Sequence, residues 1–367
     1  MALSEAARGG EARELSALLE RAATGGRLSQ DEGLRLLEEA DLLALGEAAD
    51  RRRLALHPSG QVTFILDRNI NYTNVCNVYC KFCAFYRAPG KPDTYVLTRE
   101  ELTQKIEETL AVGGTQILMQ GGVHPDLKID WYEDLLRWIK ANFPIHVHAF
   151  SPVEIRRVAE FSDLDLETTL RRMIDAGLDS IPGGGAEILV DRVRKQIAPL
   201  KDSTDEWLEV MRTAHRLGLR TTATMMFGHV ETAADIVEHL ERVRALQDET
   251  GGFTAFIPWT FQPDHTHLRA PRATAVDYLR VLALSRLYLD NVENLQLSYV
   301  TMGAKVGQIA MRFGANDFGS LMLEENVVSQ AGAKFLMERG EIERLIRDAG
   351  FTPVLRNQRY EVLEVLG

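Results

Sequence analysis

Three cysteines, Cys76, Cys80 and Cys83, are the only cysteines of the chain and lie within eight residues of one another. Thiolates are the soft ligands that iron–sulfur clusters and zinc prefer. The spacing C-x3-C-x2-C supplies three thiolates from one loop, which can wrap a cubane and leave one iron without a protein ligand. That iron could chelate a small molecule. The spacing therefore predicts a [4Fe–4S] cluster held by Cys76, Cys80 and Cys83.

Two other uses of these cysteines stay open. Zinc would need a fourth ligand such as His124, although zinc knuckles usually pair short C-x2–4-C units. A disulfide with one free thiol is rare in a cytoplasmic chain. Packing in the core is disfavoured, because the loop NYTNVCNVYCKFCAFYR (71–87) is rich in Asn, Tyr and Lys.

The loop that carries the cysteines follows the first of eight short apolar segments. These predicted strands are QVTFILD (61–67), TQILMQ (115–120), IHVHAF (145–150), LDSIPG (178–183), RTTATMMF (220–227), FTAFIPWTF (253–261), LQLSYV (295–300) and the weak run 316–323. Amphipathic helices alternate with them. Eight strand–helix units predict an α/β fold, a (β/α)8 TIM-type barrel, although a six-unit open barrel with C-terminal additions would look similar.

Residues 1–58 have helical patterning, including an S-x-x-E capping box at Ser29 and Glu32. We expect an N-terminal helical extension over residues 1–58, followed by the barrel with C-terminal helices over residues 59–367.

Charge and hydropathy exclude several classes of partner. The net charge is −11 and no long basic run is present, which argues against binding to nucleic acid. No apolar stretch approaches the roughly 18 residues that span a membrane, and the N-terminus lacks a signal-peptide core. We therefore expect a cytoplasmic chain without a membrane partner.

The unusual polar strings all follow predicted strands, at the barrel face where TIM-type enzymes keep their active sites. GGVHP follows the second strand, GGGAE the fourth and GHVE the fifth, while ANDFG opens the eighth unit. On the third strand, His146 and His148 must point to the same side. We expect His148 to be a site residue and leave His146 undecided.

The cysteine spacing, with Phe82 just before the last cysteine, resembles the signature of the radical S-adenosylmethionine (SAM) superfamily. The strings NYTNVC (71–76) and CKFCAFYR (80–87) resemble the family of futalosine-pathway enzymes and deazaflavin FO synthases. HAFSPVEI (148–155), SIPGGGAEIL (180–189), TATMMFGHVE (222–231) and GANDFGSLMLEENVV (314–328) are most similar to its futalosine cyclases of menaquinone biosynthesis. Aminofutalosine synthase and FO synthase subunits are the alternatives within the family, and a non-catalytic iron–sulfur or zinc protein is the alternative outside it.

The resemblance implies two cofactors, the [4Fe–4S] cluster and SAM, and a small-molecule substrate, dehypoxanthine futalosine. It implies that a 5′-deoxyadenosyl radical abstracts the ribose C4′ hydrogen, after which the ring closes onto the benzoate and a base takes a proton. An electron donor such as flavodoxin or ferredoxin is also implied.

Gly121 and Gly122 match the superfamily's GGE motif, whose carbonyls receive the SAM amino group, although Val123 replaces its glutamate. Glu187 resembles the acidic residue that contacts SAM, but could equally be a first-turn helix glutamate. The expected cofactor-binding residues are Phe82, Gln120, Gly121, Gly122, Ser151 and Glu187. The expected substrate-binding residues are Arg87, Gly184 and Asn316. The candidates for proton transfer are His148, Glu231, Tyr299 and Asp317, with Glu324 and Glu325 as further carboxylates.

Overall fold

Three helices precede the barrel in the computed structural model, which describes residues 2–333, 335 and 337–367, with side chains from residue 13 onward. They are α1 (Ala2–Ala23), α2 (Gln30–Glu39) and α3 (Leu42–Leu56). The predicted capping box is present at the start of α2, where the Ser29 N–H donates to Glu32 at 2.8 Å. The N-terminal helical extension is confirmed, while the division into domains at residue 58 stays a prediction.

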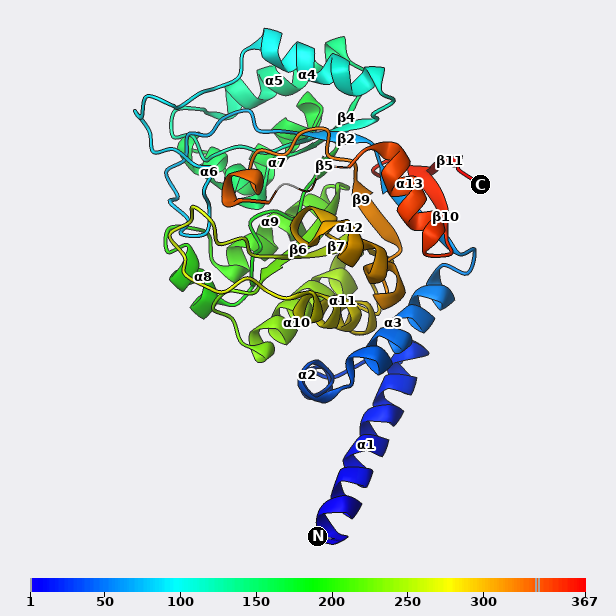
Figure 1. Ribbon diagram of the computed structural model, residues 1–367. Coiled ribbons are helices and arrows are strands. Elements are labelled where there is room, and N and C mark those ends of the chain that lie inside the picture. Colours follow the sequence, from blue (N-terminus) through cyan, green and yellow to red (C-terminus); the bar gives the residue numbers. More distant parts are fainter. Residues whose placement is uncertain (1, 334, 336) are drawn as a thin grey trace.

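The extension is anchored on two barrel helices, α10 (Ala233–Thr250) and α11 (Ala275–Tyr288). Helix α3 packs on α11, and α2 packs on α10 and α11. Helix α1 runs outward from the body of the molecule (Figure 1). Gly33 of α2 must be small, because a Cβ there would lie 2.7 Å from the ring of Tyr288.

Seven parallel strands form most of the barrel wall, in the order β2-β3-β4-β5-β6-β7-β8. They are β2 (Asp67–Ile70), β3 (Gln116–Met119), β4 (His146–Ala149), β5 (Ser180–Ile181), β6 (Arg220–Phe227), β7 (Phe253–Thr260) and β8 (Asn294–Leu295). A smaller sheet pairs β1 (Gln61–Ile65) with β9 (Asp317–Ser320) and β10 (Thr352–Arg356), and β11 (Val362–Val365) lies antiparallel to β10.

The smaller sheet closes the barrel that the larger sheet forms in part. Only Leu66 separates β1 from β2, and a bridge between Gln296 and Asp317 joins the end of β8 to β9. If β1 and β2 are counted as one strand, the described part of the chain forms eight parallel strands around the barrel. The predicted α/β barrel is confirmed.

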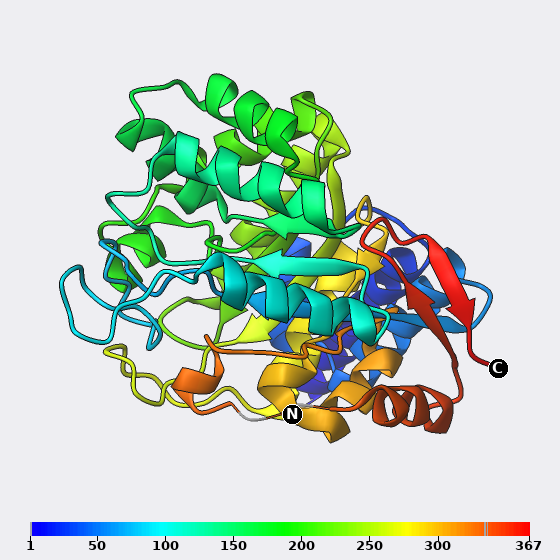
Figure 2. The same ribbon diagram turned by 90° about the horizontal axis from the view of Figure 1, so that it is seen from above.

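Helices cover the outside of this curl (Figure 2). Besides α10 and α11 they are α4 (Arg99–Ala111), α5 (Ile129–Asn142), α6 (Pro152–Phe161), α7 (Leu166–Ala176), α8 (Asp191–Ile197), α9 (Thr204–Arg216), α12 (Tyr299–Ala310) and α13 (Arg339–Asp348).

The seventh strand is shorter than predicted and Tyr299 does not lie on it. LQLSYV alternates like a strand, but the Ser298 N–H donates to the hydroxyl of Tyr278 at 2.7 Å and the chain turns into α12 at Tyr299. The C-terminus also differs from the expected helices, since α13 is followed by two strands. The run TPVLR (352–356) pairs with the free edge of β1, a contact with no local sequence signal.

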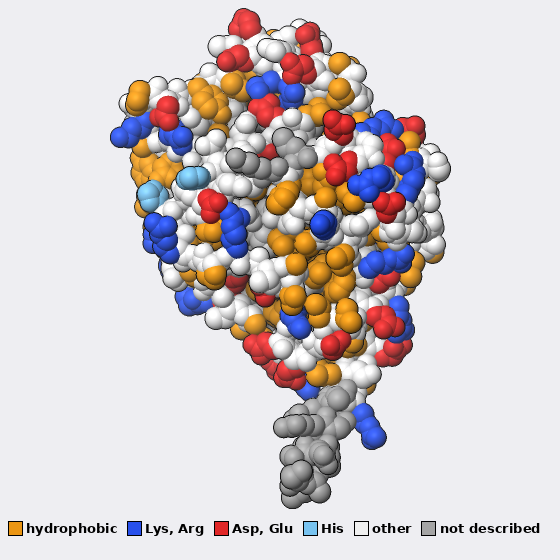
Figure 3. Space-filling model, viewed as in Figure 1, with side chains coloured by type: hydrophobic (Ala, Val, Ile, Leu, Met, Phe, Trp, Pro, Cys, Tyr) orange, Lys and Arg blue, Asp and Glu red, His pale blue; other side chains and the backbone are white. Residues whose placement is uncertain are grey.

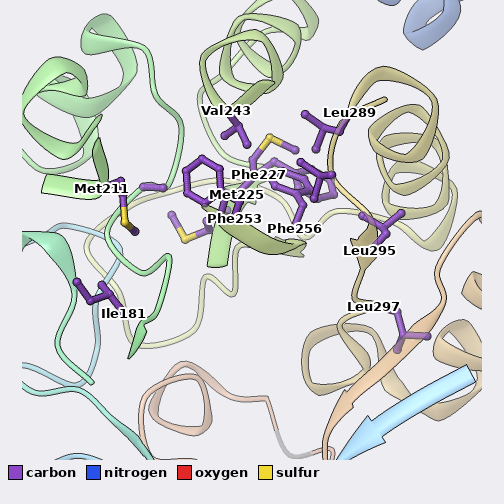
Figure 4. Close-up of a cluster of buried hydrophobic side chains, with 14 of the residues drawn as sticks. Ile181, Met211, Met225, Phe227, Val243, Phe253, Phe256, Leu289, Leu295 and Leu297 are labelled. Carbon is purple, nitrogen blue, oxygen red and sulfur yellow. The ribbon is translucent and has the colours of Figure 1, made fainter. Parts of the chain in front are cut away.

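Apolar side chains fill the space between the strands and the outer helices. In Figure 4, Met225 and Phe227 of β6 lie beside Phe253 and Phe256 of β7, and Val243 of α10 approaches them from outside. All five side chains are buried. This packing fixes the positions from which the loops at the carboxyl ends of the strands extend.

Candidate active site at the carboxyl ends of the strands

The cysteine loop leaves the barrel directly after β2 and is held by its own backbone. The Cys76 N–H donates to the carbonyl of Arg87 at 2.9 Å, and the Cys83 N–H donates to that of Cys80 at 3.2 Å. The guanidinium of Arg87 donates to the carbonyls of Ala84, Phe85 and Tyr86 at 3.0–3.2 Å. Arg87, an expected substrate ligand, is therefore engaged in holding the loop that presents the cysteines.

The three thiols are near enough to influence one another electrostatically; Cys80 is buried, and Cys76 and Cys83 are partly exposed. Burial raises the pKa of Cys80 to about 12, and burial likewise raises the pKa of Cys83. The backbone N–H groups of Phe85 and Tyr86 point at the Cys83 sulfur, and the Val78 N–H donates to the Cys76 sulfur at 3.5 Å. N–H groups aimed at sulfur stabilise thiolates bound to iron. The loop therefore fits an iron–sulfur cluster.

A single zinc ion fits the loop less well. Ligands of one zinc each lie about 2.3 Å from it, whereas cysteines of a cubane each bind a different iron and are more widely spaced. Among the described residues, no three His, Cys, Asp or Glu side chains converge on one ion. The feature that favours a cluster over zinc is the C-x3-C-x2-C spacing itself.

Gly121 and Gly122 pass so close to the cysteine loop that no side chain fits there. A Cβ at Gly122 would lie 2.1 Å from the carbonyl oxygen of Val75 and 2.9 Å from the Cβ of Cys76. The Gly121 N–H donates to the buried carboxylate of Glu154 at 3.0 Å. The two glycines therefore lie against the cysteine loop. The resemblance implies such a position for residues that bind SAM.

Glu154 also explains where Ser151 lies. The backbone N–H and the hydroxyl of Ser151 both donate to Glu154, at 2.8 and 2.6 Å, and the hydroxyl of Tyr72 donates to it at 2.8 Å. Ser151 caps α6 and positions the second-strand glycines through Glu154. The S-x-x-E spacing of Ser151 and Glu154 is the sequence signal for this contact.

The barrel interior holds a cavity of about 260 Å³. Gln120, His148, Gly184, Glu187 and Tyr299 line it, so the structure brings these five expected site residues together. Gln120 and Gly184 touch, since a Cβ at Gly184 would lie 2.4 Å from the Gln120 amide nitrogen. The segment after β9 also lines the cavity, and it includes Glu325, one of the further carboxylate candidates.

Glu187 lies in a loop rather than in a helix turn, because α8 begins only at Asp191 and Glu187 has φ 41°. Its carboxylate accepts from Lys201 at 2.9 Å and lies 3.8 Å from Arg194. The Lys201 ammonium also lies 5.3 Å from the ring centre of Phe82. A buried ion pair therefore links the cavity wall to the cysteine loop.

His148 lies in the cavity wall with its partner His146 on the same strand. Both rings reach the hydroxyl of Ser180, at 2.6 Å from His148 Nδ1 and 2.7 Å from His146 Nε2. The two histidines share one side of β4, as the alternation of the strand predicts. Burial lowers the pKa of His148 to about 3, so the ring is neutral at pH 7.

Four other expected site residues are engaged in holding the fold. Asp317 forms an ion pair with Arg356, and Asn316 accepts from Arg286 at 2.6 Å. Glu231 accepts from the N–H groups of its own loop, and the Tyr299 hydroxyl donates to the Ser320 carbonyl at 2.8 Å. Asp317, Asn316 and Glu231 do not line the cavity, whereas Tyr299 does.

Sequence reasoning missed several polar residues inside the barrel. Asp67, Asn69 and Gln116 line the cavity, and Gln116 donates to the buried Asp67 carboxylate. Burial raises the pKa of Asp67. The sequence signal for the first two was their spacing, because Asp67 and Asn69 lie two residues apart on β2 and so share one face of the strand. Lys201 had no such signal, because only the fold brings it to Cys80.

The described helices contain no segment that is both long enough and apolar enough to span a membrane.

The fold has close structural counterparts among radical SAM enzymes. HydG, a maturase of the [FeFe]-hydrogenase, superposes with a TM-score of 0.74 over 95% of this chain and 77% of its own, at 16% identity. Methylornithine synthase (PylB) superposes with a TM-score of 0.71 over 92% of this chain and 97% of its own, at 18% identity. A model of the radical SAM superfamily matches residues 70–243. The superpositions show the barrel fold, and the superfamily model covers the segment that contains the cysteine loop.

Sequence similarity defines the branch. A model of the CofH/MqnC C-terminal region matches residues 250–366. Cyclic dehypoxanthine futalosine synthase of Halalkalibacterium halodurans is 48% identical over 95% of both chains, and that of Streptomyces coelicolor is 48% identical over 97% of this chain and 90% of its own. A Methanopyrus kandleri 5-amino-6-(D-ribitylamino)uracil–L-tyrosine 4-hydroxyphenyl transferase is 40% identical over 93% of this chain and 91% of its own. The chain belongs to the radical SAM family, in the branch that contains the cyclic dehypoxanthine futalosine synthases.

Proposed function

We propose that the protein converts dehypoxanthine futalosine into cyclic dehypoxanthine futalosine for menaquinone biosynthesis. The observation that carries this proposal is the 48% identity to two cyclic dehypoxanthine futalosine synthases over nearly the whole chain. The 40% identity to the hydroxyphenyl transferase is lower over a similar length, so the cyclase is favoured over the other chemistry of this branch.

Cys76, Cys80 and Cys83 would hold the [4Fe–4S] cluster, and Gly121 and Gly122 would receive the amino group of SAM. When bound, these cofactors supply a 5′-deoxyadenosyl radical that removes the hydrogen at C4′ of the substrate ribose. The substrate radical then closes onto the benzoate ring, and loss of an electron and a proton restores aromaticity.

The chain's own residues position the reactants and exclude water. Gln120, Gly184 and Glu187 line the cavity and would contact SAM. Val327 and Val328 line both this cavity and a smaller one beside Cys83, so the segment after β9 covers the space between them. Such closure protects a radical from stray hydrogen donors and water.

A negatively charged electron carrier such as flavodoxin or ferredoxin would reduce the cluster. Lys81, inside the cysteine motif, is exposed, and its carbonyl accepts from the loop after β7 at 2.8 and 2.9 Å. Lys195 and Arg269 are also exposed nearby on α8 and on that loop. In Figure 3, basic and histidine side chains gather along the left edge of the view, with a few acidic side chains among them, on a protein whose net charge is −11.

The test is anaerobic turnover of the reconstituted protein with SAM, a reductant and dehypoxanthine futalosine. We expect 5′-deoxyadenosine and a product two hydrogen atoms lighter than the substrate, as mass spectrometry measures. The variant Cys80→Ala should form neither compound. Formation of 5′-deoxyadenosine without a cyclised product in the native protein would contradict the proposed substrate.

A further inference from the structure

A second cavity lies on the far side of the His148–Ser180 contact. It measures about 270 Å³ and is lined by His146, Asp179, Arg220 and Arg359, among others. Strand β4 begins at His146, so this cavity is at the amino ends of the strands, opposite the cysteine loop. Ser180 and Gln358 separate it from the reaction cavity, which His148 lines.

Three side chains cross this partition in one hydrogen-bonded chain. His148 Nδ1 lies 2.6 Å from the Ser180 hydroxyl, and the same hydroxyl lies 2.7 Å from His146 Nε2. His148 and Ser180 are buried, at 5% and 3% exposure, whereas His146 is partly exposed to the second cavity. At its inner end, His148 Nε2 has only a long contact, 3.3 Å, to the Gln358 side chain.

We propose that His148, Ser180 and His146 form a proton relay, which carries the proton lost from the substrate ring out through the amino-terminal end of the barrel. This inference rests on the proposed cyclisation, because only the rearomatisation step releases a proton inside the closed cavity. His148 is the catalytic base, and Ser180 and His146 act through it. The exit leads away from the cysteine loop, where SAM and its radical would be held.

The relay releases one proton to water for each proton that it takes from the substrate. Before transfer, His148 Nδ1–H donates to Ser180 Oγ, and the Ser180 hydroxyl donates to His146 Nε2. The C–H bond of the cyclised ring radical breaks, and its proton binds His148 Nε2. One electron of the ring radical passes to a one-electron acceptor of the iron–sulfur class, which restores the aromatic ring. Each hydrogen bond then reverses direction, and His146 Nδ1 releases one proton to water. A hydroxyl suits the middle position, because it both donates and accepts.

The charges around the chain keep both rings neutral at rest. Burial lowers the pKa of His148 to about 3, and His146 and Arg356 act in the same direction. Burial also lowers the pKa of His146; Asp179 opposes this shift, while Lys140 and Arg359 reinforce it. Neutral imidazoles each carry one donor and one acceptor nitrogen, which is what a relay requires.

Ser180→Ala breaks the relay with the smallest change in shape. We expect this variant to form 5′-deoxyadenosine at nearly the native rate, since hydrogen abstraction does not use the relay. The cyclised product per 5′-deoxyadenosine should fall at least about tenfold, since a positioned proton transfer contributes roughly 10²–10⁴-fold. His146→Gln should act in the same way, and Ser180→Thr, which keeps the hydroxyl, should stay close to native.

A matched control exists on the outside of the barrel. His215 also makes two imidazole–hydroxyl contacts, at 2.7 Å to Thr250 and 2.7 Å to Thr221, but it does not line either cavity. His215→Gln and Thr250→Val should leave the product ratio unchanged while costing similar stability in urea unfolding. A native ratio in Ser180→Ala would overturn the relay. Absence of cyclised product from the unaltered protein would instead overturn the proposed function.

Discussion

At the residue scale, the polar side chains in and near the barrel differ in how many of their hydrogen bonds the fold already uses. Glu231 and Asp317 have both carboxylate oxygens occupied by neighbours. His148, by contrast, keeps one nitrogen at a long contact of 3.3 Å and lines the reaction cavity. A group with a free position can accept a proton during turnover, which is why we propose His148 rather than Glu231 or Asp317 as the base.

Glu231→Gln tests this distinction. Burial acts to raise the pKa of Glu231, but the hydrogen bond and charge of His229 and the loop N–H groups outweigh it and lower the pKa to about 2. An unfolded glutamate has a pKa of about 4.3, so the ionised side chain stabilises the fold above about pH 5. This contribution is lost as the pH falls toward 2.

We expect Glu231→Gln to lower the free energy of unfolding by about 2–3 kcal/mol at pH 7. The difference from the native protein should shrink below about pH 4, as urea titrations at several pH values can measure. Product per 5′-deoxyadenosine should remain native. If the Glu231→Gln variant kept the native stability but formed little product per 5′-deoxyadenosine, Glu231 rather than His148 would be the base.

At the element scale, strand β10, the last but one of the chain, ties distant parts of the barrel together. It pairs with β1 along its length, and its last residue, Arg356, forms a buried bidentate ion pair with Asp317 of β9. The Arg356 side chain lines the reaction cavity, and Gln358 just after it lies between the two cavities. Strand β10 thus links β1 to β9, and together with the residues just after it contributes to the walls of both cavities.

Arg356→Met should therefore destabilise the protein by about 3–5 kcal/mol, because it leaves the fully buried Asp317 carboxylate without its counter-charge. The double variant Arg356→Met with Asp317→Asn should recover part of this loss in urea unfolding. Arg171→Met, which breaks an exposed pair with Glu167, should cost below about 1 kcal/mol. Equal costs for the buried and exposed pairs would contradict this role of β10.

At the scale of the whole molecule, the proposed reductant must find the cysteine loop on an acidic protein. The exposed cations Lys81, Lys195 and Arg269 lie on or near that loop. A local positive region favours encounter with a negatively charged carrier, and salt weakens the attraction.

Lys81→Glu with Arg269→Glu should slow cluster reduction by flavodoxin about tenfold or more at low ionic strength. Stopped-flow absorbance can follow the reduction. Reduction by dithionite, a small reagent that needs no docking surface, should change little. Arg344→Glu on α13, an exposed site on another face of the molecule (Figure 1), should behave like the native protein. An unchanged flavodoxin rate in the double variant would place docking elsewhere.

The sequence alone determined the features whose signals are local. Cysteine spacing specified the cysteine loop, the capping box at Ser29 specified where α2 begins, and short apolar runs specified the barrel strands. These signals survive because spacing, capping and strand alternation depend on neighbours within a few residues.

Only the tertiary structure decided which polar residues line the cavity and which are engaged elsewhere in the fold. Asp317 meets Arg356, which lies 39 positions later in the chain, and Lys201 meets Glu187 and Cys80 across loops. Ser180 joins two histidines more than 30 residues away. The sequence shows that a motif contains a carboxylate or an imidazole, but it does not show whether the lone pairs of that group already accept hydrogen bonds. Long-range packing decides this.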